Sequence, residues 1–223
     1  MNLLVDADDT LWQNIRVFNQ VNAEFASWVR SGDQTETLAE LDVIQRSFVK
    51  LHGYGAKTFT LSLAEGIRQL AGREPTKSDS ERIASFVEPL AWKSIELLDG
   101  VAQTLAELHV RHALTLFTKG DRAEQQRKTD VSGLGVYFSR VHIVDEKHEE
   151  TYRDFVEDNG LDPSATWMIG NSPRSDIAPA LKAGIGAVYI PHADTWGHED
   201  GEIDLAHERL LQIDSFPELL RHF

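Results

Sequence analysis

The chain has no cysteine among its 223 residues. Disulfide bonds, zinc–thiolate sites and a cysteine nucleophile are therefore excluded. No run of apolar residues approaches the ~18 that a membrane-spanning helix requires. The N-terminus has neither the basic leader nor the apolar core of a signal peptide. We therefore expect a cytoplasmic protein that has no membrane partner.

Basic residues are scarce: 22 Lys and Arg stand against 36 Asp and Glu, which gives a net charge of −14. Nucleic-acid binding rests largely on clustered Lys and Arg, so we expect no nucleic-acid partner. An anionic substrate would be repelled at long range, so a site for one needs cations of its own. The 41% of hydrophobic residues are enough for a sizeable core, with or without a smaller appended domain.

The most informative stretch runs from Leu3 to Trp12, where an apolar run is followed by two closely spaced aspartates. Residues 3–5 predict a strand of a parallel sheet that is covered on both faces. Asp6 and Asp8 follow at its carboxyl end, where functional groups gather in open α/β sheets. Two carboxylates this close repel each other unless a cation or a shared proton compensates. A solvated surface is the alternative, but the preceding apolar run favours a metal or acid/base site.

Residues 14–98 show helical periodicity and contain no clear strand candidate. Ser62 and Ser78 each precede a glutamate by three residues, which predicts two helix starts. After residue 98, apolar stretches predict strands that alternate with helices, as in right-handed βαβ units. We predict a Rossmann-like α/β core with a parallel sheet, formed by residues 1–13 and 99–223. An all-helical cap, residues 14–98, would be inserted after the first strand.

Polar side chains also follow the later predicted strands. Thr118 and Lys119 end the second strand, Lys147 opens a helix beyond the third, and Gly170 to Asp176 follow the fourth. Phosphoryl transfer needs such parts: a nucleophile, a proton donor, cations that hold phosphate and ligands for a divalent metal. The sequence therefore predicts one site at the carboxyl edge of the sheet.

The order of these elements resembles the haloacid dehalogenase-like hydrolase superfamily, in its phosphatase branch with a helical cap between the first two motifs. The first motif of that family, Asp-x-Asp-x-Thr, is matched by Asp6 to Thr10. Its second, a Ser or Thr after the next core strand, is matched by Thr118, and its third, a lone Lys, by Lys147. Its fourth, Gly-Asp-x-x-x-x-Asp, is matched imperfectly by Gly170 to Asp176.

The resemblance implies a two-step hydrolysis of a phosphomonoester. Asp6 would attack phosphorus and become an aspartyl phosphate, which splits one hard step into two easier ones. Asp8 would protonate the leaving oxygen and then accept a proton from the attacking water. Thr118 and Lys147 would bind the phosphate, and Lys119 is a further candidate for that role. The partner would be a small phosphorylated metabolite.

The resemblance also implies Mg²⁺ as the cofactor, held by Asp6, Asp8, Asn171 and Asp176. Asn171 stands where the family usually has an aspartate. One charge lost at ~4 Å amounts to roughly 4 kcal/mol of Coulomb energy at an effective dielectric constant of ~20, before hydration offsets much of it. We therefore expect a lower Mg²⁺ affinity than an aspartate would give.

Three alternatives stay open. A catalytically weak or inactive binding or regulatory protein would keep the fold and bind Mg²⁺ and phosphate poorly. A haloacid dehalogenase would release a halide, which needs no proton, and the presence of Asp8 is evidence against it. A phosphomutase would need a second phosphate site, and no added basic cluster marks one.

Overall fold

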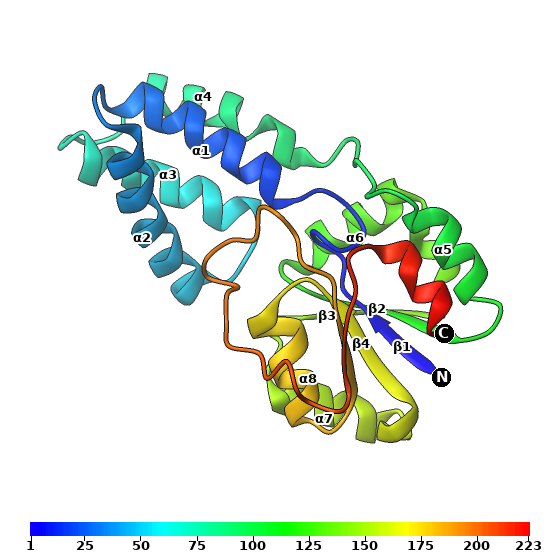
Figure 1. Ribbon diagram of the computed structural model, residues 1–223. Helices are drawn as coiled ribbons and strands as arrows, with labels where there is room; N and C mark the ends of the chain where they lie inside the picture. The colour runs from blue at the N-terminus through cyan, green and yellow to red at the C-terminus, as the bar shows by residue number, and fades with distance from the viewer. The chain divides into compact units, whose positions relative to one another are not determined.

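The computed structural model describes residues 1–223, which fall into two compact units (Figure 1). The core unit comprises Met1–Ile15 and Ser94–Phe223, and the helical unit comprises Arg16–Lys93. The chain therefore leaves the core unit soon after its first strand and returns to complete it. The helical unit is an insertion in the sequence of the core unit.

The core unit is built on a six-stranded sheet with the strand order β3-β2-β1-β4-β5-β6. Every pairing in it is parallel, which confirms the predicted α/β fold. The first strand lies between β2 and β4, so side chains that follow it are flanked by the ends of both neighbours. The strands are β1 (Asn2–Val5), β2 (Ala113–Lys119), β3 (Arg140–Val144), β4 (Thr166–Gly170), β5 (Gly186–Tyr189) and β6 (Leu210–Gln212).

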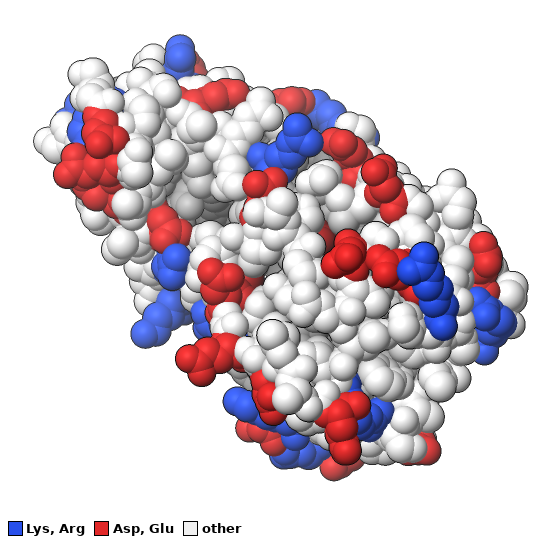
Figure 2. All heavy atoms as spheres, viewed as in Figure 1, with Lys and Arg blue, Asp and Glu red and all other residues white.

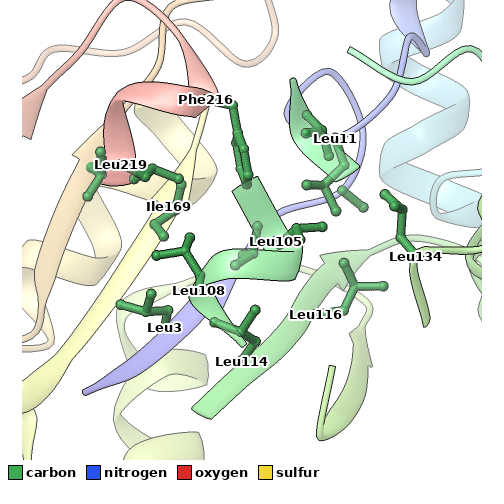
Figure 3. Packing of buried hydrophobic residues seen from close by; sticks show 14 of the residues in the cluster. Leu3, Leu11, Leu105, Leu108, Leu114, Leu116, Leu134, Ile169, Phe216 and Leu219 are labelled. Atoms are coloured by element: carbon green, nitrogen blue, oxygen red, sulfur yellow. The ribbon is translucent and has the colours of Figure 1, made fainter. Parts of the chain in front are cut away.

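Helices cover both faces of this sheet, which explains why β1 is apolar at successive positions. Leu3 packs in one cluster with Leu105 and Leu108 of α5 (Val101–Leu108) and with Phe216 and Leu219 of the C-terminal 3₁₀-helix Phe216–Arg221 (Figure 3). Leu4 packs in the opposite cluster, with side chains of α7 (Glu149–Asp158) and α8 (Ala178–Lys182). Both clusters are buried, so the position of β1 is fixed from two sides.

The helical unit contains α1 (Ile15–Val29) except for its first residue, together with α2 (Gln34–His52), α3 (Ala56–Leu70) and α4 (Lys77–Phe86). Both helix starts predicted from serines are wrong. Ser62 lies inside α3, where its hydroxyl donates to the carbonyl oxygen of Phe59. Thr76, two residues before Ser78, caps α4 by accepting from the backbone N–H of Asp79, whose carboxylate accepts from the N–H of Thr76 in return. Serine inside a helix can bond backward to its own turn, so its spacing alone does not mark a start.

One helix of the core unit escapes the sequence analysis. It is α6 (Arg122–Ser132), which begins after Asp121, whose side chain accepts from the backbone N–H of Glu124. Its sequence, RAEQQRKTDVS, has almost no apolar residue and so lacks the periodicity that predicts a helix. The side chains that it buries are polar: Gln125, Lys128 and Thr129.

None of the helices is long and apolar enough to cross a membrane. On the face drawn in Figure 2, Lys and Arg side chains lie among Asp and Glu side chains and do not form one broad basic patch.

Candidate active site

The carboxyl edge of the sheet brings the predicted site residues together. Val5 is the last residue of β1 and is in register with Leu116 of β2 and Ile169 of β4. Asp6 therefore emerges beside the ends of both strands, and its backbone N–H donates to the carbonyl oxygen of Ile169 over 2.9 Å. The central place of β1 is what puts Asp6 at the middle of the site.

Lys147 links two carboxylates that come from different loops. Its Nζ atom lies 2.5 Å from Oδ1 of Asp6 and 2.7 Å from Oδ1 of Asp176. All three side chains are buried. Gly170 makes room for this cluster, because a Cβ atom there would lie 2.3 Å from Oδ2 of Asp176. The sequence predicts one site at this edge of the sheet, and the structure joins these three charged side chains in one hydrogen-bonded network.

The cluster carries two acidic groups and one basic group, and both its burial and this excess of acidic groups shift the pKa of Asp6. Burial, together with the charge of Asp176, raises it to about 7, although Lys147 opposes the shift. For Lys147 itself burial lowers the pKa, but the two carboxylates outweigh burial and raise it. A further cation at this position would favour the ionised form of Asp6.

Thr10 connects Asp6 to Asn171. Its hydroxyl lies 3.1 Å from Oδ2 of Asp6 and 3.1 Å from Oδ1 of Asn171. A hydroxyl carries one proton, so it can donate to only one of these two acceptors at a time. The other oxygen then lacks this donor in a buried environment, and a hard cation that binds oxygen ligands would satisfy it.

The donor set therefore fits Mg²⁺ in its chemistry, with carboxylate and amide oxygens and no nitrogen or sulfur ligand. It is sparse, however, because no group of three or more His, Cys, Asp or Glu side chains is arranged to hold a metal ion. Asp6, Asp176 and the amide oxygen of Asn171 would hold the ion, and main-chain or water oxygens would have to supply its remaining ligands.

Asp8 belongs to a second network, formed with α6. Its carboxylate accepts hydrogen bonds from Nε1 of Trp12 over 2.7 Å and from Nε2 of Gln125 over 2.8 Å. Nζ of Lys128 lies 3.0 Å from both of its oxygens and 2.9 Å from the side-chain oxygen of Asn14. The Lys128 side chain is only 2% exposed. The proposed acid/base residue is thus held in place by a buried ammonium.

Thr118 and Lys119 end β2 next to these networks. Thr118 is buried, so its position at the strand end is fixed. Lys119 turns toward the loop after β4, where its Nζ atom donates to Oγ of Ser175 over 2.7 Å. It also pairs with Glu199 over 2.8 Å and with Glu146 over 3.2 Å.

Several residues of the site escape the sequence analysis. Gln125 and Lys128 lie on the unpredicted α6, and Glu199 lies in a segment without regular secondary structure. Among these contacts, only the one between Asp8 and Trp12 could be anticipated from the local sequence. The two residues are four positions apart, and side chains at that spacing can meet across a turn. The other contacts join residues that are far apart in the chain, so no local sequence pattern predicts them.

Comparison with known proteins places this chain among hydrolases. The family model described as haloacid dehalogenase-like hydrolase matches residues 2–184. No curated protein sequence matches the chain. Among solved structures, a haloacid dehalogenase-like family hydrolase from Xanthomonas campestris is 29% identical, with a TM-score of 0.85, and the match covers 100% of this chain and 91% of that one.

More distant structures share the fold. The L-2-haloacid dehalogenase from Xanthobacter autotrophicus is 18% identical, with a TM-score of 0.65, over 99% of this chain and 96% of that one. A predicted phosphoglycolate phosphatase from Haemophilus somnus is 18% identical, with a TM-score of 0.64 and the same coverage. The fold is thus shared by a protein named as a haloacid dehalogenase and by one named as a predicted phosphatase.

Proposed function

Because the chain belongs to the haloacid dehalogenase-like hydrolase family, we propose that it hydrolyses a small phosphomonoester through an aspartyl phosphate on Asp6. The observation that carries the proposal is the buried contact of 2.5 Å between Asp6 and Lys147, at the end of a central strand that also delivers Asp8. The first carboxylate supplies a nucleophile, the ammonium offsets anionic charge, and the second carboxylate supplies a proton carrier.

In the first step an oxygen of Asp6 forms a bond to phosphorus while the bond from phosphorus to the ester oxygen breaks. The leaving oxygen takes a proton from Asp8. In the second step water attacks the phosphorus and gives a proton to Asp8. The bond between phosphorus and the Asp6 oxygen breaks, so the free Asp6 carboxylate is restored and phosphate is released. Lys147 stays beside the reacting oxygens in both steps and stabilises their negative charge.

Mg²⁺ is the cofactor that we propose for this reaction, with Asp6, Asp176 and Asn171 as side-chain ligands and the carbonyl oxygen of Asp8 as a main-chain ligand. When bound, it would neutralise charge on the phosphate oxygens. The proposal is supported by the excess of carboxylate over ammonium in the cluster and by the single proton of Thr10 that two acceptors share.

A second candidate, dehalogenation of a haloacid, is favoured by one observation. All contacts of the Asp8 side chain use its oxygens as acceptors for Trp12, Gln125 and Lys128. To protonate a leaving group, Asp8 must turn away from some of these contacts. A halide leaves carbon without a proton, so attack of Asp6 on that carbon would need no acid, and Asp8 could keep its contacts in that step. Water would then hydrolyse the ester on Asp6 and release the hydroxy acid.

The two candidates release different products. The protein is incubated with 4-nitrophenyl phosphate and, separately, with 2-chloropropionate, each with Mg²⁺ or EDTA, and free phosphate and chloride are measured. We expect phosphate release that needs Mg²⁺ and no chloride above the background of Asp6→Asn. Chloride release that is indifferent to EDTA, without phosphate release, would replace the phosphatase proposal with the dehalogenase.

A further inference from the structure

A long irregular segment joins the last two strands of the sheet. Residues 190–209, drawn in orange in Figure 1, contain no helix or strand. Connections of more than about 12–15 residues without regular structure are uncommon in compact domains and are often functional. Most of this segment is partly or fully exposed, but the side chain of Glu199 is only 15% exposed. The carboxylate of Glu199 is thus largely covered by the rest of the core unit.

Three donors converge on the carboxylate of Glu199. Nζ of Lys119 lies 2.8 Å from Oε1, and the hydroxyls of Ser172 and Ser175 lie 2.8 Å and 2.6 Å from Oε2. The side chains of Ser172 and Ser175 are in turn fixed, because the N–H of Ser175 donates to Oγ of Ser172 and Lys119 donates to Oγ of Ser175. The three donors, which we name the carboxylate cradle, are thus ordered by contacts besides those with Glu199.

The backbone around Glu199 is held less tightly. Its carbonyl oxygen accepts from the N–H of Arg174 over 3.2 Å, and it lies 3.2 Å from the Ser172 hydroxyl, whose single proton it shares with Oε2. The guanidinium of Arg174 donates to the carbonyl oxygen of His198, and this contact is exposed. Release of Glu199 would break these main-chain contacts, part of them exposed, together with its three side-chain hydrogen bonds, and a substrate carboxylate would restore the latter.

We propose that Lys119, Ser172 and Ser175 form a binding subsite for a carboxylate of the substrate, and that Glu199 fills this subsite until the substrate replaces it. That the cradle binds a carboxylate is inferred from its geometry alone. That this carboxylate belongs to the substrate rests on the proposed function. The substrate class would be phosphate monoesters of small hydroxycarboxylic acids.

Charge and geometry favour a carboxylate over a second phosphate. Lys119 also pairs with Glu146, so the cradle without Glu199 has one ammonium and one carboxylate and no surplus positive charge. It offers three hydrogen bonds to two oxygens, which a carboxylate accepts in full. Burial tends to raise the pKa of Glu199, but Lys119 and the two hydroxyls lower it to about 2, as expected when donors are arranged for an ionised carboxylate.

The cradle adjoins the nucleophile through one residue. Ser175 precedes Asp176, whose carboxylate lies 2.7 Å from the same Lys147 ammonium that contacts Asp6. A small molecule with a phosphate at Asp6 and a carboxylate in the cradle would therefore bridge neighbouring parts of one site. Release of Glu199 would couple substrate binding to movement of residues 190–209.

The binding step is tested without any catalytic readout. Acetate binding is measured by calorimetry at constant ionic strength for the wild-type protein, Glu199→Ala and the double variant Glu199→Ala/Lys119→Met. We expect Glu199→Ala to bind acetate at least tenfold more tightly than the wild type, and the double variant to lose this gain. Glu202→Ala, which removes an exposed carboxylate from the same segment, is the matched control and should bind acetate as the wild type does. Equal affinity of Glu199→Ala and wild type would overturn the proposal.

A second variant and a pair of substrates keep the proposal testable if Glu199→Ala does not fold. Glu199→Gln keeps the size of the side chain and should bind acetate more tightly than the wild type does. Phosphoglycolate and ethyl phosphate differ by a carboxylate, and we expect a kcat/KM at least tenfold higher for the former, with the preference lost in Lys119→Met. Equal kcat/KM for both esters would refute the carboxylate subsite, whereas no phosphate release from either would refute the proposed function and leave the acetate result standing.

Discussion

Lys147 and Asp6 are 141 residues apart in the chain, yet Nζ of the first lies 2.5 Å from Oδ1 of the second. The contact forms because β1 enters the middle of the sheet and the loop after β3 ends at the same edge. The contact serves both the fold and the proposed chemistry. The ammonium offsets the free-energy cost of burying the carboxylate, and it would also stabilise negative charge on a phosphate.

Removal of this ammonium should be costly. Lys147→Met would leave Asp6 and Asp176 buried without their cation, and breaking a buried pair on one side costs about 3–5 kcal/mol of unfolding free energy. We expect a loss of this size in urea unfolding at pH 8 without added metal. Lys182→Met, which removes an exposed lysine at the end of α8, should change stability by less than about 0.5 kcal/mol. A similar small loss for Lys147→Met would contradict the burial argument.

The raised pKa of Asp6 predicts how the metal-free protein responds to pH. Its folded-state pKa is about 7, above the ordinary value of 3.8, because burial and Asp176 disfavour the charged form. The folded state therefore binds the proton more tightly than the unfolded state, so this contribution is present below pH 4 and is lost as the pH rises toward 7. We expect a fall in unfolding free energy over this range that is smaller in Asp6→Asn. Parallel curves for the two proteins would show that another group is responsible.

Mg²⁺ affinity should increase in Asn171→Asp. The new carboxylate would add a charge beside an oxygen set that already has the chemistry for a hard cation. We expect at least a tenfold lower dissociation constant in a calorimetric titration with MgCl₂. Asn19→Asp, at an exposed position of α1, adds the same charge elsewhere and should leave the affinity unchanged. Equal affinities for Asn171→Asp and the wild type would remove Asn171 from the ligand set.

The contact between Asp8 and Lys128 can be measured by a double-mutant cycle. Lys128 is buried and lies 3.0 Å from both Asp8 oxygens. The unfolding free energies of Asp8→Asn, Lys128→Met and the double variant should give a coupling energy of about 1–3 kcal/mol. A coupling near zero would indicate that other groups near this ammonium, Asn14 and Glu124 among them, hold Lys128 without Asp8.

The sheet and the centre of the site could be predicted because both leave local signals. A strand that is covered on two faces reads as a continuous apolar run, and Leu3 to Val5 are such a run. Parallel strands end at one edge, so the polar residues that follow each strand must meet there. This reasoning brings Asp6, Lys147 and Asp176 into one region before any coordinates are known.

The surroundings of Asp8 and Lys119 could not be predicted in this way. Helix α6 buries Gln125 and Lys128 against polar partners, so its buried face is hydrophilic and leaves no apolar periodicity. Glu199 reaches Lys119 from an irregular segment 80 residues further along the chain, and such a pairing depends on the whole fold. These parts of the site are formed by long-range contacts between polar side chains. Such contacts cannot be predicted from the spacing of residues along the sequence.

The central claim is that Asp6 hydrolyses a phosphomonoester with the help of Mg²⁺, and phosphate release tests it most directly. The wild-type protein and Asp6→Asn are each incubated with 4-nitrophenyl phosphate and with a panel of small phosphorylated metabolites, in the presence of Mg²⁺ or EDTA. We predict release that needs both the metal and Asp6, with Asp6→Asn at least a thousandfold slower. Wild-type release no greater than that of Asp6→Asn, even at high Mg²⁺, would contradict the claim.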